Sequence, residues 1–152
     1  MGSTMNNNKG FTIIELMAVV SIVSILAVVA MATYSDYLVR SKVGEGMVFA
    51  SEAKTSVTEY FYNTQRWPKN NRQAGLPAPE DYDKYDYISR LEVSSAIPDG
   101  IITVTFKIEG SNAHNKKLQL IPSTKDGLVS WTCLPPEEMG LDVNQAPPNC
   151  RG

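Results

Sequence analysis

Few side chains in this sequence could carry out chemistry. The 152 residues include one histidine, His114, and two cysteines, Cys133 and Cys150. A zinc site needs about four nitrogen, sulfur or oxygen ligands held together, and covalent catalysis needs a nucleophile beside a base. We interpret His114 as a solvated residue of a polar turn, because no second titratable ligand is near it in the sequence. We therefore expect a protein that is not an enzyme, with no catalytic, cofactor-binding or metal-binding residues.

The composition fits one folded domain. Hydrophobic residues make up 43% of the chain and charged residues 20%, as in ordinary globular proteins. With 14 basic and 16 acidic side chains the net charge is −2, which excludes a polybasic nucleic-acid binder and an acidic tail.

Glu15 has the most unusual sequence neighbourhood of any charged residue. It precedes residues 16–32, which carry no charge, and a helix over residues 11–32 would be about 33 Å long, enough for a bilayer core of roughly 30 Å. A signal peptide has a shorter apolar core of roughly 7–15 residues. The segment therefore predicts an N-terminal membrane anchor. A carboxylate within such a span costs roughly 2.5–3.5 kcal/mol, so Glu15 either has a partner or reaches the headgroups from the edge of the span.

The residues before Glu15 resemble the processing site of type IV prepilins. Lys9 precedes a Gly10–Phe11 pair, and Glu15 is the fifth residue counted from Phe11. In that family a dedicated peptidase cuts after the glycine and methylates the new N-terminal phenylalanine. The resemblance implies a leader peptide over residues 1–10, cleavage between Gly10 and Phe11, and N-methylation of Phe11. Translation from the second methionine, at position 5, would give the shorter leader usual in the family.

The resemblance also implies a role for Glu15 in subunit assembly. Cleavage would create an amine on Phe11 at membrane depth. In the family the glutamate of one subunit neutralises the amine of its neighbour, so that two groups that are costly in lipid offset each other and set the register between subunits. Tyr34, Tyr37 and Arg40 also stand where family members commonly have these residues.

Two positions depart from the family pattern. Ser24 and Ala32 replace a glycine and a proline that many members have, and serine and alanine favour helix more than those residues do. The sequence leaves open whether the helix unwinds there in a filament and whether the chain is a major or a minor subunit. We expect the hydroxyls of Ser21 and Ser24 to bond to carbonyls of the preceding turn.

Beyond residue 32 the apolar residues follow a helical period. They form one stripe: Val43, Met47, Ala50, Ala53, Val57 and Phe61. Gly44 and Gly46 each weaken a helix by about 1 kcal/mol relative to alanine, so we expect a local bend there. Pro68 disfavours helix in the residue before it. The pattern predicts one helix over residues 11–62, apolar all round in its first half and amphipathic in its second.

The rest of the chain predicts a proline-rich connection followed by a sheet. Residues 63–86 contain several prolines and tyrosines and are expected to form an irregular but ordered connection. Strands are expected at 87–94, 102–108, 117–121 and 128–133, with a hairpin at Asp126–Gly127. The fold class is α+β: the amphipathic half of the helix packs on a four-stranded antiparallel sheet, which resembles the pilin fold. The expected parts are a leader (1–10), a transmembrane or filament-core helix half (11–33) and a globular domain (34–152).

Cys133 and Cys150 follow the membrane segment, where an oxidising compartment would join them. The alternative is two free, buried thiols. The Trp131-Thr132-Cys133 and Asn149-Cys150 arrangement resembles the disulfide-bounded loop of type IVa pilins, which implies a disulfide around residues 133–150. Closing a loop of this size contributes roughly 3 kcal/mol in the chain-entropy model.

The resemblance implies a structural subunit of a type IV pilus that polymerises through its N-terminal helix. The polymer would serve surface adhesion and twitching motility, with DNA uptake as a further role. The implied partners are further copies of the chain in a helical filament, the prepilin peptidase and the assembly machinery of the inner membrane. A host or abiotic surface is a further partner. The chain would begin as a single-pass precursor in the inner membrane and end in an extracellular pilus.

Two alternatives remain. The first is a minor pilin or a pseudopilin of a type II secretion machine, where the disulfide loop favours the pilus and Ala32 leaves a minor role open. The second is a membrane-anchored extracytoplasmic binding module, such as a DNA receptor. Without residues 1–10 the chain has 13 basic and 16 acidic side chains, and a charge of −3 disfavours direct binding of nucleic acid.

Overall fold

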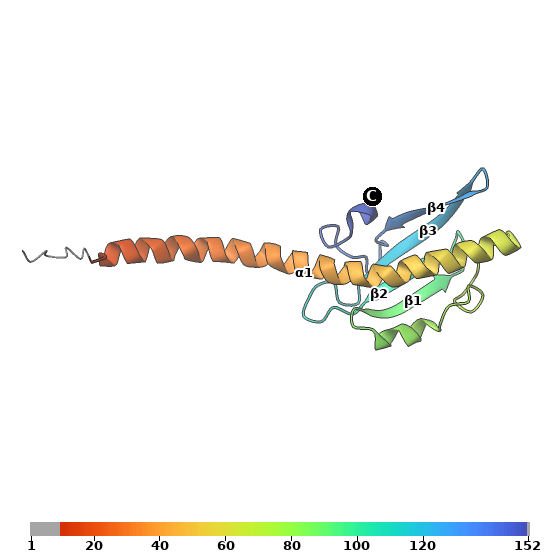
Figure 1. The fold of residues 1–152 in the computed structure, drawn as a ribbon, viewed down its shortest axis with the longest axis horizontal. Coiled ribbons are helices and arrows are strands. Elements are labelled where there is room, and N and C mark those ends of the chain that lie inside the picture. The colour runs from red at the N-terminus through yellow and green to blue at the C-terminus, as the bar shows by residue number, and fades with distance from the viewer. Residues whose placement is uncertain (1–9, 152) are drawn as a thin grey trace, which may run out of the picture. The chain divides into compact units, whose positions relative to one another are not determined.

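The computed structural model describes residues 10–151, so residues 1–9 of the expected leader and Gly152 lie outside the described part. The chain divides into two compact units, one ending at Ser35 and the other beginning at Asp36. A single helix, α1, runs over Ile13–Thr64 and contributes to both units (Figure 1). The long helix expected over residues 11–62 is thus confirmed, with both ends displaced by two residues.

In the described part of the first unit, α1 buries no large apolar side chain. Every large apolar side chain between Phe11 and Met31 is between 54% and 88% exposed, as expected for a segment apolar on all sides. By length and composition α1 is able to cross a membrane, and none of its most apolar window is buried. The helix is continuous through Ser24.

The second unit contains a four-stranded antiparallel sheet in the order β1-β2-β3-β4 (Figure 1). Its strands are β1 (Ile88–Ser94), β2 (Ile101–Phe106), β3 (Lys117–Lys125) and β4 (Leu128–Leu134). The Asp126–Gly127 hairpin joins β3 to β4, and both turn residues have positive φ, 53° and 80°, as type I′ turns require. The α+β architecture predicted from the sequence, a long helix with a four-stranded antiparallel sheet, is confirmed.

Two strand ends differ from the prediction by two or more residues. The second strand ends at Phe106 and not at residue 108, because the chain turns away and Phe106 pairs with Asn115 and Lys116 through backbone hydrogen bonds of 2.9 Å. Ile108 is still 2% exposed, because it packs into the core outside the strand. The third strand continues to Lys125, four residues past the predicted end, because pairing with β4 extends along the hairpin.

The amphipathic half of α1 packs on this sheet. The buried side of the helix comprises Val39, Val43, Ala50, Ala53 and Val57. The buried side of the sheet includes Leu91, Ile102, Val104, Phe106 and Leu118. α1 passes through Gly44 and Gly46 as unbroken helix. A Cβ at Gly46 would lie 2.8 Å from side-chain atoms of both Ile88 and Phe106, so this glycine allows the helix to approach the sheet closely.

The connection between helix and sheet is ordered, as its aromatic residues indicated, and it contains a short 3₁₀ helix, η1 (Pro79–Lys84), that the sequence did not predict. Asn71, 3% exposed, lies against β1. Its carboxamide donates to the carbonyl of Leu91 at 2.8 Å and accepts from the backbone N–H of Val93 at 2.7 Å. The side chain therefore occupies the outer edge of β1 in the way a neighbouring strand would.

Candidate functional site

Gly10 and Phe11 lie immediately before helix α1. Phe11 is 88% exposed, and a Cβ built on Gly10 would meet no atom within 4 Å. The peptide bond between them therefore lies in open, non-helical backbone. A peptidase can therefore reach this bond without first unwinding the helix.

Thr12 and Glu15 form a reciprocal cap on the first turn of α1. The Glu15 carboxylate accepts from the Thr12 backbone N–H at 2.9 Å and from the Thr12 hydroxyl at 2.7 Å. The Glu15 backbone N–H in turn donates to the Thr12 hydroxyl oxygen at 3.3 Å. This is a capping box, which satisfies backbone donors that have no partner inside the helix.

Sequence reasoning missed the role of Thr12, although a threonine followed three positions later by a glutamate is a readable signal. The cap means that the Glu15 carboxylate is hydrogen-bonded within its own helix, although Thr12 carries no charge to offset it. This carboxylate lies within the first turn, four residues from Phe11, with both interactions made to Thr12.

The hydroxyls farther along the apolar segment are satisfied within the helix. Ser21 donates to the Met17 carbonyl at 2.8 Å and Ser24 to the Val20 carbonyl at 2.7 Å, as expected. These bonds satisfy the donor of each hydroxyl within the helix, so this part of α1 presents a largely apolar surface with small residues in it.

In the second unit the two cysteines are joined. Cys133 at the end of β4 and Cys150 in the short 3₁₀ helix η2 (Pro148–Cys150) form a disulfide with a Cα–Cα distance of 4.5 Å. This is the pairing that the resemblance implied. The enclosed loop is also bonded to β3, since the Lys117 N–H donates to the Met139 carbonyl at 2.8 Å and the Leu141 N–H to the Lys117 carbonyl at 3.0 Å.

The same loop is bonded to α1 through two polar side chains. The guanidinium of Arg40 donates to the Asn144 carbonyl at 2.6 Å, and the Gln145 carboxamide donates to the Asp36 carboxylate at 3.4 Å. Gln145 is 3% exposed. Arg40 thus has a structural task, while sequence reasoning did not identify Gln145 because nothing in the proline-rich loop marks one glutamine as buried.

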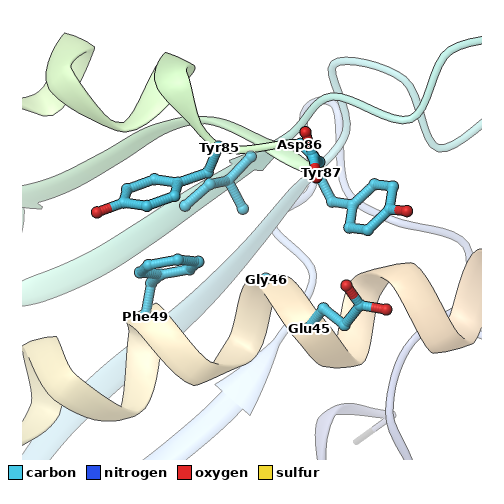
Figure 2. A pocket seen from close by; sticks show the side chains of 7 residues that line it. Glu45, Gly46, Phe49, Tyr85, Asp86 and Tyr87 are labelled. Atoms are coloured by element: carbon cyan, nitrogen blue, oxygen red, sulfur yellow. The ribbon is translucent and has the colours of Figure 1, made fainter.

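A small pocket lies between α1 and the connection that leads into β1. Its volume is about 170 Å³. We call it the acidic aromatic pocket. The residues that line it are Glu45, Gly46, Phe49, Tyr85, Asp86, Tyr87 and Ile88. Figure 2 shows Phe49 and Tyr85 on one side of Gly46, and Glu45 and Tyr87 on the other. The Phe49 and Tyr85 ring centroids are 4.2 Å apart.

Tyr82 lies beside this pocket in the core, where its ring meets that of Phe49 edge-on at 6.2 Å. Burial of the side chain, with a further contribution from the Glu52 carboxylate, raises the pKa of Tyr82 to about 12. A phenol whose pKa lies so far above 7 is not suited to acid–base chemistry at physiological pH. His114 lies in an exposed turn, and no three His, Cys, Asp or Glu side chains among residues 10–151 are placed to hold a metal ion.

Two family models match the chain. Residues 39–151 match a family described as pilin, a bacterial filament protein. Residues 5–31 match the prokaryotic N-terminal methylation motif, which covers Gly10, Phe11 and Glu15.

Curated relatives match most of the chain. A type IV major pilin protein of Neisseria gonorrhoeae is 42% identical over 127 residues, which cover 82% of this chain and 74% of the relative. A fimbrial protein of Neisseria meningitidis serogroup A is 42% identical over 129 residues, covering 82% of this chain and 72% of the relative. A fimbrial protein of Eikenella corrodens is 37% identical over 145 residues, covering 94% and 90%.

Proposed function

The chain belongs to the type IV pilin family, a family of structural proteins and not of enzymes, and from this premise we propose that it polymerises through α1 into a pilus that serves surface adhesion and twitching motility. Its role as a structural subunit of a pilus follows from the family. The way in which it assembles, its processing and its location are the proposal.

The observation that carries the proposal is the exposed apolar surface of the first unit. Fourteen large apolar side chains of residues 11–31 are more than half exposed, which far exceeds what a soluble monomer tolerates. Such a surface needs lipid or other helices around it. Before assembly the inner membrane supplies the lipid, and in the filament the same segments of other copies replace it, since apolar helices without partners associate by close packing.

Processing would occur at the open backbone between Gly10 and Phe11. Cleavage there by the prepilin peptidase leaves an amine on Phe11, which is then methylated. The charge of this amine would be offset by the Glu15 carboxylate of a neighbouring copy. Glu15 suits this task because the cap by Thr12 fixes it on the first turn, so that the carboxylate does not need to be ordered again when subunits meet.

The test of processing is the N-terminal residue of the protein in filaments sheared from cells. Mass spectrometry should find a chain that starts at N-methylated Phe11. Residues 1–10 still attached to filament subunits would contradict the proposal. Gly10→Val should leave the leader uncleaved and abolish filaments.

The test of assembly is Glu15→Ala. The variant should be cleaved normally and give few or no filaments, because the Phe11 amine then has no carboxylate to offset it in an apolar core. Glu109→Ala is the matched control, since Glu109 is an exposed acid after β2. Filaments of normal number and length from Glu15→Ala would show that the carboxylate is not needed for assembly.

A further inference from the structure

The acidic aromatic pocket combines two carboxylates with three aromatic rings, and neither carboxylate forms an ion pair within the described part of the chain. The ion pairs formed within residues 10–151 use Glu80, Asp83 and Glu92 as acids, and none uses Glu45 or Asp86. A volume of about 170 Å³ exceeds the ~30 Å³ of one water molecule, so the pocket has room for the end of one basic side chain.

The chemistry of the pocket fits a cation with a flat or alkylated surface. Faces of aromatic rings attract ammonium and guanidinium groups, and an adjacent carboxylate adds an ion pair. Two lysines of the chain already behave in this way around the pocket. The Lys42 ammonium lies 5.5 Å from the Tyr87 ring centroid, and the Lys84 ammonium lies 5.2 Å from that of Tyr85. Neither lysine lines the pocket itself.

A matching basic segment follows the C-terminal end of α1. Arg66, Lys69 and Arg72 fall within seven residues that contain no acid, and all three are exposed. None of them takes part in an ion pair within the described residues. Arg66 and Lys69 line a cavity of about 520 Å³ in which Asp99 is the only acid. The segment Arg66–Arg72 therefore presents positive charge to its surroundings.

The pocket and the basic segment are too far apart to meet in one chain. Gly46 at the pocket and Thr64 at the end of α1 are separated by about 27 Å of helix, at ~1.5 Å per residue. Two complementary patches at different places on one surface can be joined when copies associate head to tail. Such a contact builds a helical filament when its rotation does not close into a ring.

We propose that the acidic aromatic pocket of one copy binds a basic side chain from the Arg66–Arg72 segment of the next copy, as a contact that sets the axial repeat of the filament. This inference rests on the proposed function, because it takes a second copy of the chain as the partner. Arginine is the favoured occupant, since its guanidinium stacks on Tyr85 or Tyr87 while its edge donates to Glu45 or Asp86.

The first experiment measures how strongly the pocket binds a peptide of the basic segment when no filament is present. The full chain in detergent micelles, carrying ¹³C-labelled tyrosine, is titrated with a capped peptide of residues 66–72 (RWPKNNR). The ring signals of Tyr85 and Tyr87 should shift and saturate.

Variants and a control peptide test whether charge drives this binding. The double variant Glu45→Gln/Asp86→Asn should bind about tenfold more weakly, because exposed charge contacts each contribute a few-fold. Glu109→Gln should bind as the unaltered chain does. A neutral peptide, QWPQNNQ, should not shift the signals. No shift with RWPKNNR, or equal binding by the double variant, would overturn the proposal.

The second experiment places the contact in the filament. Cysteines are introduced as Asp86→Cys with Lys69→Cys, and sheared filaments are oxidised. Non-reducing electrophoresis should show dimers and longer ladders, whereas Glu109→Cys with Lys69→Cys should stay monomeric. Filaments that form normally and give no ladder from the first pair would overturn this contact and leave the proposed function intact. If the unaltered chain forms no filaments, the proposed function fails, and the peptide titration alone then decides whether the pocket binds the segment.

Discussion

The two units of this chain use the same helix in opposite ways. Residues 10–35 present apolar side chains on all sides and bury none of the large ones, whereas residues 36–64 present one apolar face and bury it on the sheet. The helix is continuous through both. Secondary structure is thus independent of burial here, and the spacing of the apolar residues decides whether the protein itself or something outside it covers the helix.

Truncation of an aromatic side chain should lower the stability of the second unit, whereas in the first unit it should impair filament assembly. Phe106→Ala removes a fully buried ring and should lower the free energy of unfolding by about 3–5 kcal/mol. Phe11→Ala removes an exposed ring and should change it by less than about 0.5 kcal/mol, while filament assembly suffers. Thermal unfolding of the full chain in detergent measures both. A large loss of stability from Phe11→Ala would mean that the first unit has a core of its own.

Removal of the disulfide should weaken the second unit alone. Cys133→Ser with Cys150→Ser frees the enclosed loop in the unfolded chain and should cost roughly 3 kcal/mol. Because Arg40 and Lys117 still hold the loop, the sheet should keep its native signals in NMR spectra. Complete loss of those signals at room temperature would show that these contacts depend on the disulfide.

Loss of the cap should affect the first unit alone. Thr12→Val removes the hydroxyl that bonds to Glu15 and should cost the first turn about 1 kcal/mol. Amide hydrogen exchange should become faster at residues 13–16 and stay unchanged in β1 to β4. Thr33→Val is a suitable control, since its hydroxyl bonds only within the helix, to the Val29 carbonyl at 3.3 Å. Equal protection of residues 13–16 in both variants would contradict the capping role.

The last effect concerns Tyr82; at neutral pH it is the smallest of the four, and it develops only at alkaline pH. Its pKa in the folded chain is about 12, whereas in the unfolded chain it is about 10. The unfolded state therefore ionises first, and the contribution of Tyr82 to stability, complete below pH 10, is lost as the pH rises toward 12. Tyr82→Phe should remove this part of the alkaline destabilisation. Unfolding temperatures between pH 9 and 12 compare the two chains, and identical pH profiles would show that Tyr82 does not contribute.

The sequence predicted the elements well because their apolar residues have strong periods. The helix follows from the spacing of residues such as Val43 and Val57, and the strand at 102–108 follows from the alternation that includes Val104. The third strand was predicted too short because residues 122–125 carry proline, hydroxyls and a charge, and only pairing with β4 keeps them extended. The strand after residue 100 was predicted too long because Ile108 keeps the alternation although the chain has left the sheet.

The polar contacts were harder to predict, since they join residues far apart in the chain. Gln145 meets Asp36 across 109 positions, and Asn71 meets Val93 across 22; neither pair leaves a local pattern. The capping box is different, because Thr12 and Glu15 are three residues apart and their types alone predict it.

Asn71 has a consequence for a protein that lives crowded among its own copies. An open strand edge is a template on which identical chains add and grow into amyloid-like aggregates. The Asn71 carboxamide already takes the donor of Val93 and the acceptor of Leu91, so this border of the sheet offers incoming strands little to pair with. Copies at the high density that the proposed filament requires would then not pair with one another through this edge of their sheets.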